Sequence, residues 1–489
     1  MTVERESGVG GGPGGAVAEP FLPRLTRHMS DLMRLAWPVM LSRAGILVMA
    51  FADIAMLGRY QVGAAGEANL GIAIFVPVLV FCIGLASGVV PVVSQAEGRG
   101  EHAEGGRAWR RAMVWAAVTS TIGAMVVFRG EWFLGALGQT PELAAAGGRV
   151  AEALAPGLIA QVLFAVCAFY LEATRRPIPA LLVMLGANLA NVALNWLLIW
   201  GHWGLPEMGA AGAALASTIV RWGAAAAMVA VILTQADPRG RGVVGPAETF
   251  WGPGGWRAGW PMRKLGLSAG LSNGFETIGF AAMSLVAGYL GALALDAYSI
   301  SHNIVSTVFM VGLGLAVATG VRVGNEEGRG RPSEAAFAGW CGFGAAAVLM
   351  GALAILVVSF RETIAAVYTA DPEVIARVSA LLVFSVFVFM PDSMQVVMGQ
   401  AVRALGDAWV AIGVYAVSFT VLLVPLGIYL ALETPLEERG LLVAISAVCV
   451  LATALMAWRF AVLTARRRPQ GAEIATSSPR SSSGVSSAR

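Results

Sequence analysis

Long apolar runs, separated by short polar segments, occupy most of the chain between positions 35 and 463. Each run has about 20 residues or more, enough for an α-helix to cross ~30 Å of hydrocarbon at ~1.5 Å per residue. The ten-residue alternation typical of membrane barrel strands is not the dominant pattern. The chain is therefore predicted to be an all-α membrane protein with twelve transmembrane helices, at about 35–58, 68–94, 109–128, 151–172, 178–200, 209–234, 263–290, 294–321, 336–360, 376–401, 408–431 and 440–463.

The composition supports a membrane protein. Hydrophobic residues make up 57% of the 489 positions and charged residues only 13%, whereas an ordinary soluble domain has roughly 25% charged residues. The mean hydropathy is +0.72. A net charge of +3 is too small for the dense basic patch of a nucleic-acid-binding protein. The expected environment is the lipid bilayer, with no nucleic-acid partner.

The positions of the arginines predict the orientation, because Lys and Arg near helix ends stay on the cytoplasmic side. Most arginines near span ends fall on one side, among them Arg107, Arg110, Arg111, Arg322 and Arg403, and few fall on the other, among them Arg59, Arg129 and Arg439. Both termini are then cytoplasmic. We expect a multi-pass protein of the plasma membrane, which is the inner membrane in a bacterium.

The spans divide into two halves. A long segment at 235–262, rich in Gly, Pro and Trp, predicts a cytoplasmic linker between six-helix lobes at 34–234 and 263–465. The ends, 1–33 and 466–489, have the composition of disordered cytoplasmic tails.

A short repeat relates the two lobes. Segment 95–100 reads QAEGRG and segment 325–330 reads NEEGRG, at an offset of 230. Repeated bundles related by a pseudo-two-fold axis are typical of secondary transporters, which hold substrate between the halves. Shared Gly/Ala composition is the alternative explanation of the repeat.

Three carboxylates fall well inside predicted spans, namely Asp53, Glu276 and Asp392. Each costs roughly 2.5–3.5 kcal/mol at a helix centre, so it requires a partner or a function. A carboxylate can hold either a proton or a cation, which is the minimal requirement for ion coupling. Arg43 and Arg221 also lie within spans, without an assigned partner, and Glu172 lies at a span end, where a solvated charge is ordinary.

Polar residues at helical spacing accompany these acids. Ser272 and Asn273 precede Glu276 by one turn, and Gln395 follows Asp392 by one turn. Pro391 frees a backbone carbonyl near Phe387. Asn188, Asn191 and Asn195 form a polar stripe on one face of the fifth span, and this stripe is the expected partner of Asp53. The alternative role for such residues is hydrogen bonding between helices, without ion coupling.

Other kinds of chemistry find little support. The one lysine, Lys264, does not follow a phosphate-binding glycine loop, and the four cysteines lie far apart without metal-site spacing. We expect no enzyme activity, no cofactor and no permanent metal. An ion gradient then has to supply the energy for transport, at ~2.3 kcal/mol per charge per 100 mV.

Several segments resemble the multidrug and toxic compound extrusion (MATE) family. Segment 35–58 (LAWPVMLSRAGILVMAFADIAMLG) resembles its first helix, and segment 170–201 (YLEATRRPIPALLVMLGANLANVALNWLLIWG) resembles its fourth and fifth. Segments 208–214 (MGAAGAA) and 321–324 (VRVG) resemble parts of its sixth and eighth helices. The similarity covers about residues 30–465 and looks closest to the NorM-type branch.

This resemblance implies twelve helices in two lobes and export of organic cations or amphipathic toxins in exchange for Na⁺ or H⁺. Asp53 matches the acid of the first lobe, and Glu276 and Asp392 match the cation site of the second, where Na⁺ would bind transiently. The archaeal-type branch has a second acid where this chain has Asn195. We expect a monomer, in which Phe387, Met390 and Met394 line a cavity for cationic or amphipathic small molecules.

Two other functions stay open. A lipid-linked oligosaccharide flippase of related architecture needs several cations in its cavity, and only Arg43 and Arg221 lie within the spans. A membrane scaffold or receptor that transports nothing has no need of intramembrane acids.

Overall fold

The computed structural model describes residues 20–61, 63–245 and 255–467, and their regular structure is helical. The helices are α1 (Phe21–Tyr60), α2 (Ala64–Ser87), α3 (Val89–Arg99), α4 (His102–Val127), α5 (Gly130–Ala136), α6 (Pro141–Ala173), α7 (Ile178–Ile199), η1 (His202–Gly204), α8 (Gly209–Leu233), α10 (Gly255–Ala258), α11 (Trp260–Tyr289), α12 (Ala292–Gly328), α13 (Pro332–Ser359), α14 (Arg361–Tyr368), α15 (Pro372–Ala404), α16 (Trp409–Tyr415), the π-helical η2 (Ala416–Leu422), α17 (Leu423–Leu432) and α18 (Glu438–Arg466).

Among the described residues, eleven helical segments are long and apolar enough to cross a membrane, with α2 and α3 forming one segment and α16, η2 and α17 another. The twelfth predicted span corresponds to α11, which has 30 residues and carries Arg263, Lys264 and Glu276. These charges lower its hydropathy, although its length is sufficient to span. Together with the comparisons reported below, the helices confirm the predicted all-α, twelve-helix fold.

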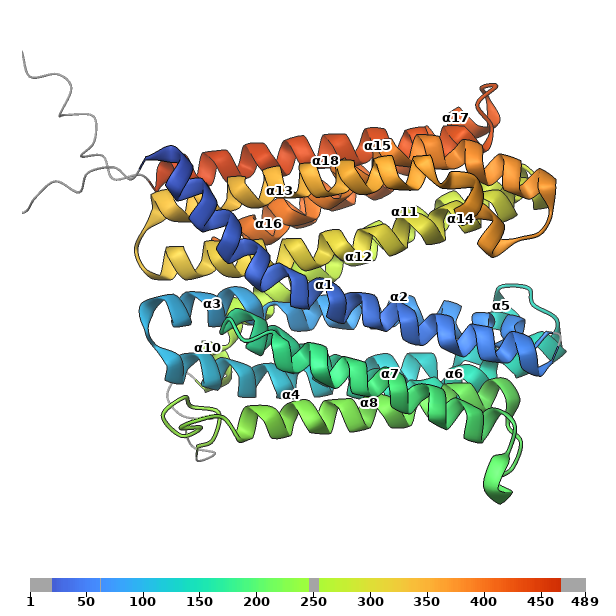
Figure 1. Ribbon diagram of the computed structural model, residues 1–489, viewed down its shortest axis with the longest axis horizontal. Coiled ribbons are helices and arrows are strands. Elements are labelled where there is room, and N and C mark those ends of the chain that lie inside the picture. Colours follow the sequence, from blue (N-terminus) through green and yellow to red (C-terminus); the bar gives the residue numbers. More distant parts are fainter. Residues whose placement is uncertain (1–19, 62, 246–254, 468–489) are drawn as a thin grey trace, which may run out of the picture.

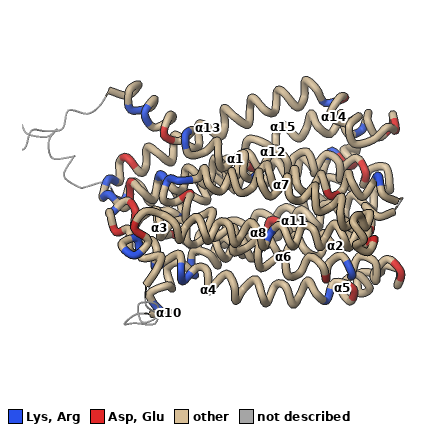
Figure 2. Tube along the Cα trace, turned by 60° about the horizontal axis from the view of Figure 1, so that its bottom comes forward, with Lys and Arg blue, Asp and Glu red and all other residues tan. Residues whose placement is uncertain are grey.

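The helices form two lobes, each with its own hydrophobic core. One core extends mainly from Leu32 to Met262, and the other from Met283 to Phe460. Figure 1 shows the lobes one above the other, with α1 crossing between them. The start of α1 and the end of α18, which are the two chain ends of the described part, lie on the same side. Figure 2 shows that charged residues gather at the two ends of the bundle, whereas the middle is mostly uncharged. This is the distribution expected of a bundle embedded in lipid.

The first helix begins earlier than the predicted span. It starts at Phe21, inside the segment expected to be a tail, because His28 and Leu32 are buried against neighbouring helices. Similarly, α11 begins at Trp260, within the predicted linker. The remaining parts of the predicted tails and linker, 1–19, 246–254 and 468–489, lie outside the described residues.

Close backbone contacts join the lobes through pairs related by the repeat. A Cβ added to Gly84 of α2 would lie 2.6 Å from Cα of Gly270, and one added to Gly314 would lie 2.9 Å from the backbone of Met40. Gly84 and Gly314 are 230 positions apart, as are Met40 and Gly270. The two contacts are therefore equivalent across the pseudo-two-fold axis.

The repeated segments themselves meet on this axis. A Cβ on Gly98 would lie 2.2 Å from the carbonyl oxygen of Asn325, and a Cβ on Gly328 would lie 2.2 Å from that of Gln95. These pairs exchange places under the same offset of 230. The repeat therefore forms a symmetric contact between α3 and α12, which shared composition alone does not explain. We call the close contacts of α2 with α11, of α1 with α12 and of α3 with α12 the seam.

Polar contacts also join the lobes, at the end of the seam where α3 meets α12. Arg322 of α12 donates hydrogen bonds to the backbone carbonyl of His28 and to its ring Nδ1. The other ring nitrogen of His28 lies 2.8 Å from Glu334, which also pairs with Arg24 at 2.9 Å. Gln95 of α3 donates to the Ala404 carbonyl at 2.7 Å. These bonds join the lobes at the end that carries both chain ends, whereas Figure 1 shows the lobes diverging toward α5 and α14.

Substituting Gly84 by Ala should destabilise the protein by about 1–3 kcal/mol, the usual range for overpacking, because the new Cβ meets backbone that cannot rotate away. The measurement is unfolding of the purified protein in detergent, followed by tryptophan fluorescence.

Gly344→Ala is the matched control. Gly344 lies within α13, and a Cβ there would meet nothing within 4 Å. The control should be neutral or stabilising by ~0.5–1 kcal/mol, as for Ala replacing Gly within a helix. Equal stability of the two variants would contradict the close contact at Gly84.

Candidate functional site

Asp53 lies at the centre of a hydrogen-bond cluster in the first lobe. Its carboxylate accepts from Asn195 of α7 at 2.6 Å and from Ser217 of α8 at 2.7 Å. Asn195 also donates to the side-chain oxygen of Asn191 at 3.2 Å, and Asn191 donates to Ser217 at 3.2 Å. Helices α1, α7 and α8 thus contribute to one hydrogen-bond network. Asp53 takes its donors from α7 and α8, because its own neighbours along α1 are apolar.

The asparagine stripe divides into two parts. Asn191 and Asn195 are fully buried and belong to the Asp53 network. Asn188, one turn earlier, donates instead to the Met184 carbonyl of its own helix at 2.9 Å. The Asn188 amide therefore donates within its own helix and not to Asp53.

Two residues near Asp53 were not assigned to it from the sequence. Ser217 is one of many small residues in α8, so its pattern gave no signal. Arg221, one turn further along α8, lies within electrostatic range of Asp53, and its guanidinium is 4.8 Å from the centre of the Phe75 ring. The spacing of four between Ser217 and Arg221 puts both on one helical face.

Glu276 and Asp392 of the second lobe come together around one amide group. The Nε2 of Gln395 donates to Asp392 at 3.0 Å and lies 3.3 Å from Glu276. Asp392 is only 4% exposed. Two like charges that share one donor repel each other strongly in a medium of low dielectric. A proton or a cation between them would relieve this repulsion.

Pro391 frees the Phe387 carbonyl within the continuous helix α15, as predicted. The Phe387 carbonyl, one turn before Pro391, accepts a hydrogen bond from Ser446 of α18 at 2.7 Å, and the Pro391 carbonyl accepts from Thr453 at 2.7 Å. Cys449 of the same helix lies 3.9 Å from the Asp392 carboxylate. These contacts hold α15 and α18 together and fix the position of Asp392.

Ser272 and Asn273 share α11 with Glu276, and Asn273 is half-buried. Ser272 is buried, and its hydroxyl has no hydrogen-bond partner among the described residues. The side-chain oxygen of Gln395 is also buried and without such a partner in the described part of the chain. The carboxylates, the Gln395 oxygen and the hydroxyl are hard oxygen donors of the kind that alkali and alkaline-earth cations prefer.

Arg403, which the charge pattern places near a span end, is a buried cation. It is 5% exposed, and it lies within electrostatic range of Glu276 and Tyr415. Its Nε and Nη1 have no hydrogen-bond partner among the described residues. Its position in α15 lets the long side chain extend back toward Gly399, because helical side chains point to the N-terminus.

The exposure of Glu172 also differs from the prediction. It is 1% exposed, and it pairs with Arg43 of α1 at 3.2 Å. The expectation of a solvated charge was wrong, since α6 buries its last turn within the lobe. Arg43 also lies 5.2 Å from the centre of the Phe169 ring. One of the two cations within predicted spans is thereby neutralised by a buried partner.

The three residues proposed to line a cavity lie on α15 at different depths. Met394 packs against the core of the first lobe, so it lies where the lobes meet. Met390 packs against the core of its own lobe. Phe387 is 64% exposed and shares a helix face with Met394, seven residues away. It therefore lies two turns before Met394 on α15, outside both hydrophobic cores.

The arrangement offers two separate carboxylate sites, one in each lobe, with a buried or half-buried arginine within electrostatic range of each. Within the described ranges, no group of three or more His, Cys, Asp or Glu side chains is placed to hold a metal ion. The chemistry available is reversible binding of protons or of cations that accept carboxylate and amide oxygens. Such sites can couple their occupancy to the packing of the helices that supply them.

Comparison with known proteins places the chain in a family. The sequence model of the MatE family matches residues 38–197 and 269–429. A probable multidrug resistance protein NorM of Caulobacter vibrioides is 33% identical over 94% of this chain and 98% of its own length. The multidrug resistance protein PmpM of Pseudomonas aeruginosa is 29% identical over 86% of this chain and 90% of its own.

Solved structures show the same fold. The eukaryotic MATE transporter AtDTX14 superposes with a TM-score of 0.81 at 18% identity, covering 91% of this chain and 99% of its own. A multidrug resistance MATE family transporter in an outward-facing conformation gives a TM-score of 0.80 at 16% identity, covering 91% and 98%.

The Asp53 network allows a test by substitution. Asn195→Ala and Ser217→Ala each remove a donor to a carboxylate, so each should destabilise the fold by about 1.5–3 kcal/mol. Because both act on one network, the double variant should lose less than the sum. The measurement is denaturant unfolding in detergent micelles.

Asn188→Ala is the control on the same helix, since Asn188 bonds only the Met184 carbonyl among the described residues. It should lose less than 1 kcal/mol, roughly the net contribution of one neutral hydrogen bond. If Asn188→Ala is as destabilising as Asn195→Ala, the special role of Asn195 at Asp53 is wrong.

Proposed function

The chain belongs to the MatE family, and we propose on this premise that it is a secondary active multidrug exporter. It exchanges cationic or amphipathic small molecules for Na⁺ or H⁺ by alternating access. The observation that carries this proposal is the pair Glu276 and Asp392, held around Gln395 in the second lobe. The full-length similarity to proteins named for multidrug resistance supports the substrate class.

The described conformation suits one step of such a cycle. The seam joins the lobes at the end that carries both chain ends, and the proposed orientation puts this end in the cytoplasm. The lobes diverge toward the opposite end (Figure 1), where α5 and α14 lie. The molecule is then outward-facing, in agreement with the fold likeness to an outward-facing MATE transporter.

Ion binding weakens substrate binding in the proposed mechanism. Ions or protons enter the Glu276 and Asp392 site and, separately, neutralise Asp53. Each charge cancelled removes attraction for a cationic substrate and changes the packing between helices, so the substrate leaves. The reverse also holds, because coupling between two binding events is reciprocal.

The substrate region lies between the lobes, along the face of α15 that carries Phe387 and Met394, with Met390 beside it. Met side chains adapt to varied shapes, and aromatic rings attract cations. The pairing of Arg43 with Glu172 argues against the flippase alternative, which needs free cations for pyrophosphate. The protein acts as a monomer, without catalysing a covalent reaction and without a cofactor, in the inner membrane if its host is a bacterium.

Glu276→Gln and Asp392→Asn should each reduce ion-driven export of ethidium from proteoliposomes at least about tenfold, since either change removes a charge that the coupling ion neutralises. Asp296→Asn and Glu362→Gln are matched controls, because both acids are exposed. Variants of Glu276 and Asp392 that export at the control rate would rule out the coupling role.

The coupling ion can be identified with the unmodified protein. Proteoliposomes that carry a Na⁺ gradient alone, or a pH gradient alone, should drive export in one case or in both. Export that needs neither gradient and instead follows the substrate gradient would contradict antiport.

A further inference from the structure

A basic pocket lies at the end of the bundle that carries both chain ends, outside the carboxylate sites. Its volume is about 540 Å³, and it is formed between the start of α4 and the loop that follows α8. Three arginines line it, Arg107 and Arg110 from α4 and Arg239 from the loop. The proposed exchange of ions and drugs does not involve this pocket.

The loop is held tightly against α4, so the pocket is a built feature. A Cβ on Gly106 would lie 2.0 Å from the Arg241 carbonyl oxygen, and one on Gly242 would lie 2.3 Å from that of Ala103. Arg110 donates to the Gly245 carbonyl at 3.1 Å. The contacts leave little freedom for the loop to move away from the helix.

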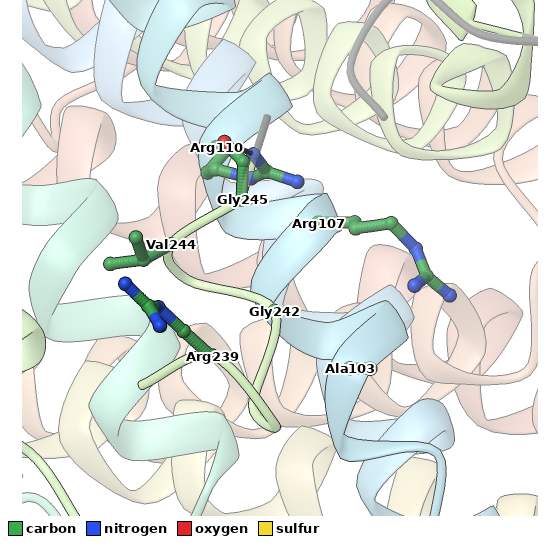
Figure 3. A pocket seen from close by; sticks show the side chains of 7 residues that line it. All are labelled: Ala103, Arg107, Arg110, Arg239, Gly242, Val244 and Gly245. Atoms are coloured by element: carbon green, nitrogen blue, oxygen red, sulfur yellow. Dashed lines mark hydrogen bonds between the residues drawn. The ribbon is translucent and has the colours of Figure 1, made fainter. Parts of the chain in front are cut away.

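The three guanidinium groups that line the pocket point in different directions. Figure 3 shows Arg110 close to Gly245, Arg239 beside Val244, and Arg107 leaving α4 in another direction. Glu104 pairs with Arg107 at 2.8 Å and with Arg111 at 3.2 Å, so it offsets part of the positive charge. Asp237 accepts from the Gly240 backbone at 2.9 Å within its own loop. Among the described residues that line or adjoin the pocket a positive excess remains, with Arg239 in no ion pair there, and this excess favours an anion.

The pocket adjoins a surface that faces lipid. Along α4, the face of Arg110 continues through apolar side chains that are 40–65% exposed, at Val114, Val118, Ile122 and Met125. Successive members lie three or four residues apart and therefore on one helix face. A molecule with an anionic head in the pocket could extend an apolar chain along this stripe.

Tryptophans place the pocket at the depth of lipid headgroups. Trp115 of α4 packs against Trp256, with ring centres 6.1 Å apart, and Arg263 lies 4.0 Å from the centre of the Trp256 ring. Trp residues gather at the membrane–water interface, where one side of the ring is apolar and the other is wet. Arg107 and Arg110 lie one to two turns from Trp115, on the side nearer the helix start.

From these observations we propose that the pocket binds the phosphodiester headgroup of an anionic phospholipid, whose acyl chains lie along the exposed stripe of α4. Guanidinium groups bind phosphate oxygens in pairs of parallel hydrogen bonds. Basic pockets between transmembrane helices are suited to such headgroups. The orientation under Proposed function decides only which leaflet supplies the lipid. Binding would connect the first lobe to the loop that leads to the second.

Native mass spectrometry of the purified full chain, titrated with phosphatidylglycerol, tests the proposal. Arg107→Gln, Arg110→Gln and Arg239→Gln together should weaken binding by about a hundredfold, since each arginine near a membrane surface contributes about a factor of five. Arg239→Gln alone should weaken it about fivefold. Arg239 is exposed, so this single variant keeps the test decisive if the triple variant does not fold.

The matched control removes three exposed arginines from other helix ends, in Arg59→Gln, Arg129→Gln and Arg439→Gln, and should bind phosphatidylglycerol like the unmodified protein. Phosphatidylcholine should bind at least about tenfold more weakly, because its headgroup has no net charge.

The proposal is overturned if the pocket variants bind as the control does, or if phosphatidylcholine binds equally well. It is also overturned if soluble glycerol 1-phosphate binds as tightly as the lipid, which would identify a free phosphate ligand. Loss of ethidium export in the pocket variants is not required, so failure here is distinct from failure of the exporter proposal.

Discussion

The close approach of backbones at the seam is the constraint on which the rest of the structure depends. Lipid is as apolar as leucine, so the hydrophobic effect does not drive helices together within a membrane, and close packing of small residues takes its place. Glycines at 84 and 314, and at 98 and 328, provide this packing in symmetric pairs. Apolar side chains of α12 join the core of the first lobe beside these close contacts, so packing of both kinds holds the lobes together.

The two lobes share the repeated backbone contacts of the seam but differ in the positions of their buried charges. The positions equivalent to Asp53 and Glu276 at the offset of 230 are Met283 and Ile46, both apolar. The seam is thus symmetric, whereas the carboxylate sites are not. Asp53 is bonded to an asparagine and a serine, and Glu276 and Asp392 share one glutamine. The two sites therefore differ in their hydrogen-bond donors and in the number of their carboxylates.

The sequence predicts the parts of this structure that depend on periodicity. Apolar run length identified the spans, and one-turn spacing identified Gln395 beside Asp392 and the asparagines near Asp53. It did not predict Arg403 or Glu172 as buried charges, because both lie near span ends and only the packing of other helices removes them from water. Ser217 was missed because a serine among many small residues has no distinctive pattern. The contact of His28 with Arg322 joins distant segments, which spacing along the chain does not reveal.

A half-buried or buried arginine lies within electrostatic range of an acid in each lobe, Arg221 near Asp53 and Arg403 near Glu276. Neither arginine is fully hydrogen-bonded by the described residues, since Nη1 of each has no partner there. Under the proposed mechanism, an incoming cation competes with a positive charge that is already covalently attached to the protein. The positive charge nearby offsets part of the cost of an ionised carboxylate in a low dielectric when the ion leaves. The arginines lower the energy of the ion-free state, and so make release of the ion possible at all.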